Sequence, residues 1–295
     1  MVDCEINDII SIIVPFYNGN IYIERLIKNI EENEIALKEA YPCMKIELII
    51  VNDSPWVEIL KFDTFLEYQI IIHSENRGIH IARISGLNAS TGKYIKFLDQ
   101  DDELTGNCIL KQFSGIFSGD VIVSNALMQM KSGEQVPLYK NDKKMKKILD
   151  ISYYVYFHNQ IASPGQCLIK KSAIPIEWIN MPLKENGSDD LFLWILMLSR
   201  GCAFIMQCDY LYIHKYTGEN LSDSSLKMAI SSLDFKTSLT KCGYVDSQIV
   251  NDYARIRQAE IDLNKKSTLG KFMYIIENID IFVRKVSLYL RSYLL

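Results

Sequence analysis

The chain has 295 residues, a formal net charge of −4, 48% hydrophobic residues and 11% aromatic residues. This apolar content excludes a disordered chain. Disordered chains remain unfolded because they have too little apolar surface to offset the entropy that the chain loses on folding. The acidic balance argues against nucleic acid as a partner, because non-specific nucleic-acid binding needs a basic surface. The seven cysteines form no CxxC pair, so we expect reduced thiols rather than disulfides or a zinc site.

The N-terminal segment and the apolar runs bear on the cellular compartment. Asp3, Glu5 and Asp8 stand where a secretory signal needs a basic start and an apolar run. Charged residues interrupt every apolar stretch before the ~18 residues that a spanning helix needs. We therefore expect a cytoplasmic protein that does not cross a membrane.

The first hundred residues predict alternating strands and helices. Apolar residues recur at helical spacing from Ile23 to Ile30 and from Ile79 to Leu87. The alternation predicts a βαβαβαβ order and an α/β fold with a mostly parallel central sheet. Short runs rich in Ile and Val mark the buried strands, which are residues 11–15, 46–51, 70–73 and 94–98.

The alternation of strands and helices is less regular in the second half of the chain. Residues 121–130 predict a strand, residues 161–172 a loop followed by a strand, and residues 191–198 a buried helix. Residues 203–214 predict one or two short strands. After residue 222 the sequence shows only helical periodicity.

The last stretch, residues 264–295, combines an apolar face with a local excess of basic residues. Six Lys or Arg residues stand there against Glu277 and Asp280. A basic amphipathic helix of this kind can rest on an anionic bilayer. Docking on the body of the protein or on a second subunit, as in a homodimer, is an equally good interpretation.

Polar residues follow each predicted strand of the first half. In such sheets ligands bind beyond the carboxyl ends of the strands. The strongest cluster is Asp99, Asp101 and Asp102, directly after the fourth strand. Neighbouring carboxylates repel unless a cation compensates, and Mg²⁺ or Mn²⁺ prefers carboxylate oxygens together with substrate phosphates. An acidic helix N-cap is the structural alternative.

Four motifs, each after a predicted strand, occur in a specific order. Because of this ordered set, the chain resembles the family 2 glycosyltransferases of GT-A fold, which are inverting enzymes that use nucleotide-diphosphate sugars. The resemblance covers roughly residues 9–222. The motifs are Pro15-Phe16-Tyr17-Asn18, Val51-Asn52-Asp53-Ser54, Asn76-Arg77-Gly78 with Ala82-Arg83 and Gly86, and Asp99-Gln100-Asp101-Asp102.

The resemblance implies a domain organisation and a fold. Residues 1–222 would form a GT-A domain, Rossmann-like, with a mostly parallel central sheet flanked by helices. Within it, residues 1–102 would bind the nucleotide sugar and residues 103–222 would form the acceptor side. Residues 223–295 would form a C-terminal helical extension.

The resemblance also assigns roles to the residues around the nucleotide. Asp53 would accept a hydrogen bond from the base, Arg83 would lie near the diphosphate, and Asp99 would face the ribose or the metal. Ile84 and Ser54 depart from the family's pattern. The nucleotide-sugar-binding set is Pro15, Tyr17, Asp53, Asn76, Arg83, Asp99 and Gln100, with Asp101 as the metal ligand.

Two motifs in the second half complete the site that the resemblance implies. Asp190 matches the general base that deprotonates the acceptor, and Asp189 stands beside it in the family's glutamate position. Ordinary N-capping of the following helix is the structural alternative. His214, followed by Asn220-Leu221-Ser222, would complete the metal or diphosphate site, and Gln166 would lie on the acceptor side.

Together these features predict a metal-dependent, inverting transferase with Mn²⁺ or Mg²⁺ as cofactor. It would move one sugar from a nucleotide sugar, UDP-linked by preference, to a saccharide or lipid-linked saccharide in bacterial surface polysaccharide synthesis. The sequence contains no QxxRW motif, which is typical of processive synthases. A glycoside hydrolase using two of the carboxylates, or a degenerate sugar-nucleotide-binding scaffold, are the alternatives.

Overall fold

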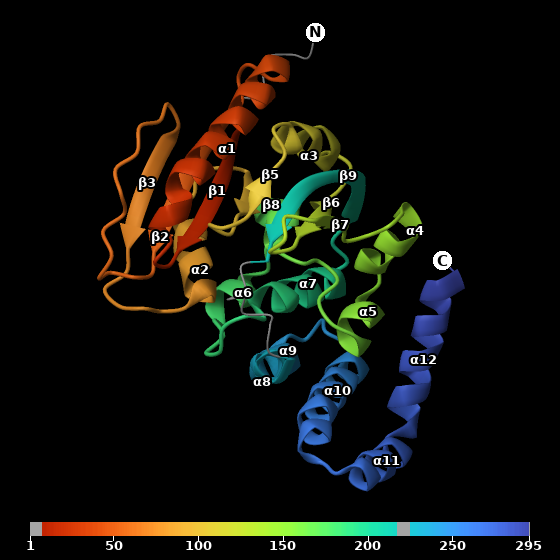
Figure 1. Ribbon diagram of the computed structural model, residues 1–295. Helices are drawn as coiled ribbons and strands as arrows, with labels where there is room; N and C mark the ends of the chain where they lie inside the picture. Colours follow the sequence, from red (N-terminus) through yellow and green to blue (C-terminus); the bar gives the residue numbers. More distant parts are fainter. Residues whose placement is uncertain (1–7, 217–224, 295) are drawn as a thin grey trace. The chain divides into compact units, whose positions relative to one another are not determined.

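The computed structural model describes residues 8–216 and 225–294 of the chain (Figure 1). The described residues fall into two compact units, which are treated separately below. The first contains residues 8–140, 161–174 and 202–216, and the second contains residues 141–160, 175–201 and 225–294. The boundary expected at residue 222 lies outside the described residues.

The first unit is built on one mixed sheet with the strand order β3-β2-β1-β4-β8-β6-β9-β5, and β7 pairs with β6. Strands β1 to β4 pair in parallel, whereas β8 is antiparallel to both of its neighbours. This confirms the predicted α/β class. The strands are β1 (Ile9–Phe16), β2 (Lys45–Asn52), β3 (Glu67–Ile72), β4 (Tyr94–Phe97), β5 (Glu103–Leu104), β6 (Val121–Gln129), β7 (Gln135–Pro137), β8 (Cys167–Lys170) and β9 (Phe204–Lys215).

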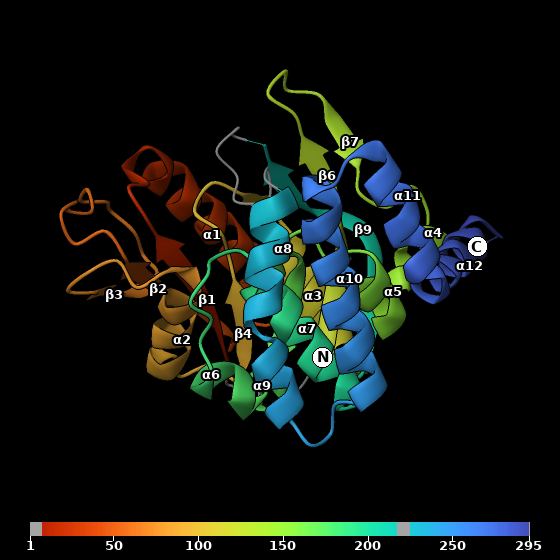
Figure 2. The same cartoon turned by 90° about the horizontal axis from the view of Figure 1, so that it is seen from below.

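Helices cover both faces of the parallel part of the sheet. Even-numbered residues of β1, such as Ile12, share a core cluster with α1 (Asn20–Ala40) and α3 (Cys108–Ile116). On the other face, α2 (Ile79–Ala89) approaches so closely that a Cβ at Gly86 would lie 2.3 Å from Cγ2 of Ile13. Figure 2 shows α1 and α2 on opposite sides of β1 and β2. Successive residues of a strand therefore serve two different cores.

The second connection of the predicted βαβαβαβ order is not helical. Residues 53–66, between β2 and β3, form turns and irregular structure. Pro55 lacks a backbone donor and disfavours a helical conformation before it. The apolar residues Val57, Ile59 and Phe62 instead pack as partly buried side chains against the core. The prediction of a helix in every crossover was therefore wrong here.

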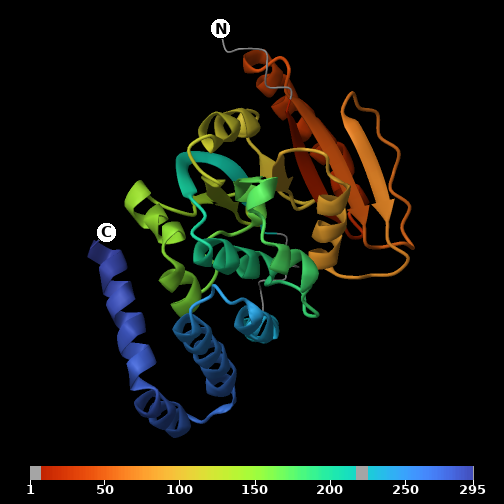
Figure 3. The same cartoon turned by 180° about the vertical axis from the view of Figure 1, so that it is seen from behind.

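The second unit is helical. Helix α7 buries every residue from Leu191 to Met197, as the apolar run predicts. The terminal amphipathic stretch is two helices, α11 and α12, and Figure 3 shows α11 at the turn between α10 and α12. No helix in the described ranges is both long and apolar enough to cross a bilayer. The helices are α4 (Asp142–Met145), α5 (Ile151–Tyr156), α6 (Ile176–Asn180), α7 (Asp189–Ser199), α8 (Ser225–Asp234), α9 (Lys236–Lys241), α10 (Ser247–Lys265), α11 (Thr268–Glu277) and α12 (Ile279–Leu294).

Candidate active site

The candidate site lies at the carboxyl ends of β1, β2 and β4. The chain leaves β1 toward β2 on one side, and β4 pairs with β1 on the other side. This reversal of strand order is where open α/β sheets bind ligands. Tyr17, Asp53 and Asp99 follow the three strand ends within two residues, so the fold brings together the residues that the sequence predicted.

Asp53 is buried and holds the loop that leads into α2. Its Oδ1 lies 2.7 Å from Nδ1 of His73 and accepts a 2.8 Å hydrogen bond from the backbone N–H of Arg77. Its Oδ2 accepts from the backbone N–H of Gly78 at 2.8 Å, and the side chain of Asn76 accepts from the same N–H at 3.0 Å. Gly78 has φ 86°, which favours glycine. The predicted residues Asp53 and Asn76 thus fix one loop, and His73 is a partner that the sequence analysis missed.

Asp99 is held from both sides. Nη2 of Arg83 donates a 2.6 Å hydrogen bond to its Oδ1, and the hydroxyl of Ser163 donates to its Oδ2 at 3.0 Å. The Arg83 side chain is buried, so this ion pair is only weakly screened by solvent. Ser163 belongs to a loop that the sequence analysis assigned to the acceptor side.

Asp101 belongs to the acidic turn after β4, and its carboxylate is the one that could bind an added ligand. Burial, followed by the negative charges of Asp102 and Asp99, raises the pKa of Asp101 to about 6. Within the described residues, no other residue donates a hydrogen bond to its side chain, although Arg25 donates to its backbone carbonyl at 2.7 Å. A crowded carboxylate with raised pKa is the group that an added cation would stabilise most.

Asp102 is buried and organises the end of β9. It accepts hydrogen bonds from the Tyr212 hydroxyl and from the backbone N–H of Lys215, and it pairs with Nδ1 of His214 at 3.0 Å. Burial lowers the pKa of His214, but the hydrogen bond to Asp102 and the surrounding carboxylates outweigh it and raise the pKa to about 9. His214 is therefore a cation at neutral pH, and no group in the described part of the chain hydrogen-bonds its Nε2–H. Residues 220–222, the rest of this motif, lie outside the described residues.

An exposed aromatic pair flanks the loop after β1. Tyr17 is 48% exposed and Trp56 is 61% exposed, with ring centroids 6.0 Å apart in an edge-to-face arrangement. Gln100 fixes the loop by accepting from the Tyr17 N–H and donating to the Tyr17 carbonyl, both at 3.0 Å. The sequence analysis missed Trp56. It could have been found as an aromatic residue directly after a predicted ligand-binding turn. Pro15 pairs in register with Val51 inside the sheet.

Gln166 supports a loop from inside the first unit. Its side chain is fully buried, accepts from the backbone N–H of Ala162 at 2.7 Å and donates to the Ser124 carbonyl at 2.9 Å. These bonds satisfy groups of the protein itself and hold the turn that presents Ser163 to Asp99.

The second unit carries the two acids at the start of α7. Asp189 is buried, whereas Asp190 is half-buried. Oδ2 of Asp190 accepts a 2.6 Å hydrogen bond from the side-chain amide of Asn159, and Oδ1 accepts from the backbone N–H of Leu191 at 2.7 Å. An acid at a helix N-terminus is favoured in its anionic form by the helix dipole. Asn159 is another residue that the sequence analysis missed.

The donor set around the acidic turn fits only certain cations. No group of three or more His, Cys, Asp or Glu side chains in the described part of the chain is arranged to hold a metal ion. Closed sites of the zinc type need such a group, whereas Mg²⁺ and Mn²⁺ accept one or two carboxylates and take phosphate oxygens for the rest. Asp101 meets the second requirement.

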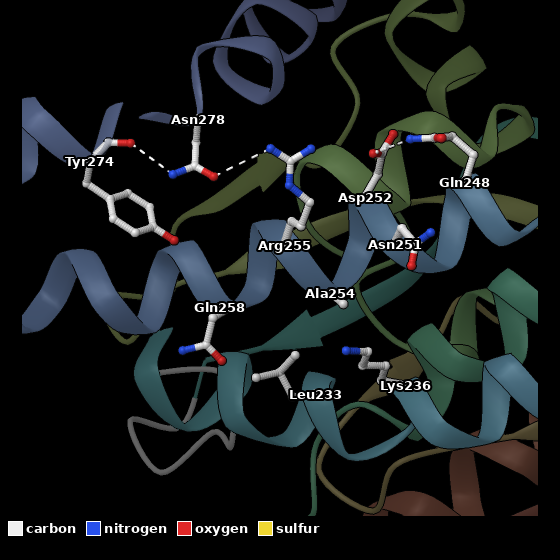
Figure 4. Close-up of a pocket in the computed structure, with 10 residues that line it drawn as sticks. All are labelled: Leu233, Lys236, Gln248, Asn251, Asp252, Ala254, Arg255, Gln258, Tyr274 and Asn278. Carbon is white, nitrogen blue, oxygen red and sulfur yellow. Dashed lines mark hydrogen bonds between the residues drawn. The ribbon is translucent and has the colours of Figure 1, made fainter. Parts of the chain in front are cut away.

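A polar pocket of about 550 Å³ lies on the exposed face of α10 (Figure 4). Of the features singled out in the sequence, only the terminal amphipathic stretch contributes to it, through Tyr274 and Asn278. Carboxamides dominate the lining. The lining residues are Leu233, Lys236, Gln248, Asn251, Asp252, Ala254, Arg255, Gln258, Tyr274 and Asn278.

Comparisons with known proteins identify the family of this chain. The family model described as Glycosyl transferase family 2 matches residues 11–175. The chain is 25% identical over 228 residues to TuaG of Bacillus subtilis strain 168, named for a proposed role in teichuronic acid biosynthesis, and this match covers 75% of the chain and 84% of TuaG. Two other curated relatives match at 30% and 28% identity, and the matches span only 17% and 54% of their length.

Two solved structures share the fold at low sequence identity. One is residues 1–349 of S. aureus TarS in complex with UDP-GlcNAc, which is 14% identical with a TM-score of 0.59, over 96% of this chain and 81% of that one. The other is the mannosyltransferase PcManGT from Pyrobaculum calidifontis in complex with GDP-Man and Mn²⁺. It is 12% identical with a TM-score of 0.52, over 99% and 86% of the two chains.

Proposed function

Because the chain belongs to glycosyl transferase family 2, we propose that it transfers a single sugar, with inversion, from a nucleotide-diphosphate sugar to a saccharide or lipid-linked saccharide. The observation that carries the proposal is the convergence of Asp53, the Arg83–Asp99 pair and Asp101 at the switch point of the sheet. At this point the base of the nucleotide would meet a hydrogen-bond acceptor. The diphosphate would meet a cationic side chain and the carboxylates beside it.

The base and ribose would lie against the loops after β1 and β2. A carboxylate offers about four acceptor positions, and three of those on Asp53 are used by His73, Arg77 and Gly78. The position left on Oδ2 suits an N–H of a uracil ring. Tyr17 and Trp56 supply exposed aromatic surface for stacking, and Gln100 keeps the Tyr17 loop in place. The TarS structure with UDP-GlcNAc supports a UDP-linked donor.

The diphosphate would be held by charge. Arg83 is fixed by Asp99 and presents a rigid guanidinium, which suits phosphate oxygens. Asp101 would ligate a divalent ion, and the Mn²⁺ in the PcManGT structure supports this. As a cation, His214 would donate from Nε2 to the diphosphate, and after losing that proton to solvent it could instead complete the ion's ligands. When bound, the ion supplies positive charge that stabilises the leaving diphosphate.

The acceptor hydroxyl must lose a proton as it attacks the anomeric carbon. Asp190 would take this proton, because its carboxylate is partly accessible and is held in place by Asn159 and Leu191. The buried Asp189 would shape the start of α7 beside it. Gln166 would act by supporting the Ser163 turn rather than by touching the sugar, because its carboxamide is used within the protein.

The acceptor side of the proposal includes contact with a membrane. On α12, Ile279, Val283, Val286 and Leu290 form a stripe of exposed apolar residues at helical spacing. With the basic residues of this segment, the stripe suits the anionic cytoplasmic face of a bacterial membrane, where lipid-linked acceptors lie. The relation to TuaG supports a role in surface polysaccharide synthesis.

Vesicle co-sedimentation tests this surface. Val283→Asp with Val286→Asp should abolish binding to phosphatidylglycerol vesicles, whereas Thr237→Asp, at another exposed site on α9, should not. If the unaltered protein does not bind, the membrane contact is excluded. If the double variant instead dissociates a dimer, the stripe is a subunit interface.

Thermal unfolding with a panel of UDP- and GDP-sugars, with Mn²⁺ or EDTA, tests the function itself. A ligand at 100 times its Kd stabilises the folded state by about 2.7 kcal/mol, so a donor should raise the Tm measurably. Asp101→Asn should remove the part of the rise in Tm that depends on Mn²⁺. Asp209→Asn, which changes an exposed acid, should not. A panel in which no nucleotide sugar raises the Tm would contradict the proposal.

A further inference from the structure

The carboxylate of Asp190 depends on a segment that precedes it by some thirty residues in the chain. Asn159 lies just after α5, in residues 157–163, which form no helix or strand. Its side-chain amide donates the 2.6 Å hydrogen bond to Oδ2 of Asp190. An irregular segment can hold a side chain accurately only if its own backbone is fixed by other contacts.

Arg257 of α10 supplies those contacts. Its Nη2 donates to the backbone carbonyl of Val155 at 3.2 Å and also to that of Phe157, and its Nη1 lies 3.0 Å from Nδ1 of His158. Two of these three attachments, at the Phe157 carbonyl and the His158 ring, fall on the two residues immediately before Asn159, and the third holds the end of α5. Arginine suits this task because its planar fork donates in several fixed directions at once.

The environment of Arg257 is specific to this contact. Only 1% of its side chain is exposed, its charge is balanced by Glu260 at 2.8 Å, and it lies over the ring of Tyr253. Partial burial of the ring, which is still 67% exposed, and then the charges of Arg257 and Lys285 lower the pKa of His158 to about 4. The imidazole is thus neutral, and Nδ1 can accept from Arg257. Burying an ion pair adds little net stability, because the cost of desolvation offsets the attraction between the charges. The buried Arg257–Glu260 pair therefore points to a role in fixing a conformation.

We propose that Asn159 is the positioning residue of the general base Asp190, and that Arg257 on the C-terminal helix α10 sets the position of Asn159. The inference rests on the proposed function, which assigns the base role to Asp190. It makes the C-terminal helices part of the machinery that activates the acceptor, in addition to any surface they offer to a membrane.

The Asn159 amide has a definite effect on the carboxylate. A hydrogen bond to the charged form lowers the pKa of an acid and limits the directions in which its remaining lone pairs point. Asn159→Ala should therefore lower kcat about 10-fold to 100-fold and move the acidic limb of its pH profile upward by about 1 pH unit. KM for the nucleotide sugar should stay the same. Asn159→Asp, which keeps the shape but adds a like charge, should move the limb further.

Release of UDP with water as acceptor provides an assay that needs no identified acceptor. The donor is the nucleotide sugar that gives the largest rise in Tm, and Asp190→Asn sets the baseline. If Asp190→Asn keeps normal turnover, the base assignment in the proposed function fails. If Asp190→Asn is inactive but both Asn159 variants keep the original pH profile, the positioning inference alone fails.

Hydrogen exchange tests the role of Arg257 without any turnover. Arg257→Met should increase exchange of the amides of residues 157–161 at least 10-fold, and Arg257→Lys should restore only part of the protection. Gln258→Ala, the next residue along α10 but exposed in the pocket of Figure 4, should leave exchange there unchanged. Equal exchange in Arg257→Met and the original protein, as measured on the folded full chain, would overturn the inference.

Discussion

The guanidinium of Arg83 and the carboxylate of Asp99 form a 2.6 Å ion pair in which the arginine side chain is only 4% exposed. The two residues lie on different elements, α2 and the turn after β4, and the pair ties them together at the end of the sheet. Removing one member of such a pair leaves the other charge desolvated without compensation.

Arg83→Met should lower the free energy of unfolding by about 3 kcal/mol, because Asp99 would stay half-buried without its cation. It should also remove the rise in Tm given by a nucleotide sugar. Urea denaturation measures the first effect. The matched control is Lys111→Met, which breaks an exposed pair with Asp209 of the same 2.6 Å length and should cost at most about 1 kcal/mol. Equal losses of unfolding free energy in the two variants would contradict the claim that the buried Arg83–Asp99 pair stabilises the fold more than an exposed pair.

Asp101→Asn should stabilise the protein when divalent ions are removed with EDTA. The pKa of Asp101 is raised from 3.8 to about 6 in the folded state, so the ionised carboxylate costs stability that grows as the pH rises from 3.8 to about 6 and stays constant above it. Allowing for its partial exposure, we expect a gain of about 1–2 kcal/mol at pH 8. The gain should vanish below about pH 4, where both states are protonated. A constant difference across this range, measured by urea titration, would exclude the shifted pKa.

His214→Gln should show its effect at low pH, whereas Asp101→Asn shows its effect at high pH. The pKa of His214 rises from 6.5 to about 9 on folding, so the imidazolium stabilises the native state fully below pH 6.5 and loses this effect as the pH passes 9. The variant should be less stable by about 2 kcal/mol at pH 6 and close to the original protein at pH 10. His158→Gln is the comparison, because the pKa of His158 is lowered from 6.5 to about 4 on folding, so its removal should raise stability below pH 6.5 and leave it unchanged above. A loss for His214→Gln that does not change with pH would refute the buried imidazolium.

Gly86→Ala should destabilise the fold even though alanine favours helices. The new Cβ would meet Cγ2 of Ile13 at 2.3 Å, so α2 must move away from β1. Overpacking of this kind costs about 1–3 kcal/mol. Gly243→Ala serves as the control, because nothing lies within 4 Å of a Cβ at that position. If both variants unfold at the same urea concentration, the close approach of α2 and β1 is wrong.

Periodicity predicted the sheet because its strands are buried apolar runs. Residues 11–15 and 46–51 lie within β1 and β2, and the helix of residues 191–198 is α7. The connection at residues 53–66 was mispredicted because the helical spacing found in the first and third connections was assumed for the second as well. Residues 203–214 form one strand, β9, with an irregularity in its register against β6 near Asn125, which interrupts the apolar alternation.

The candidate site was predictable where its residues follow strand ends, and hidden where tertiary contacts supply partners. Asp53 and Asp99 come directly after apolar runs, so their convergence followed from the parallel topology. His73, Ser163 and Asn159 come from other parts of the chain, and no local pattern marks a residue whose function is to donate one hydrogen bond. Arg257 looked like an ordinary helical charge, because its burial is known only from packing.

A crystal structure of the protein with UDP and Mn²⁺ tests the central claim most directly. We expect the uracil ring beside Asp53 and the ion in contact with a carboxylate oxygen of Asp101 and with the diphosphate. Nucleotide bound anywhere other than the carboxyl ends of β1, β2 and β4, or an ion that makes no contact with Asp101, would contradict the account.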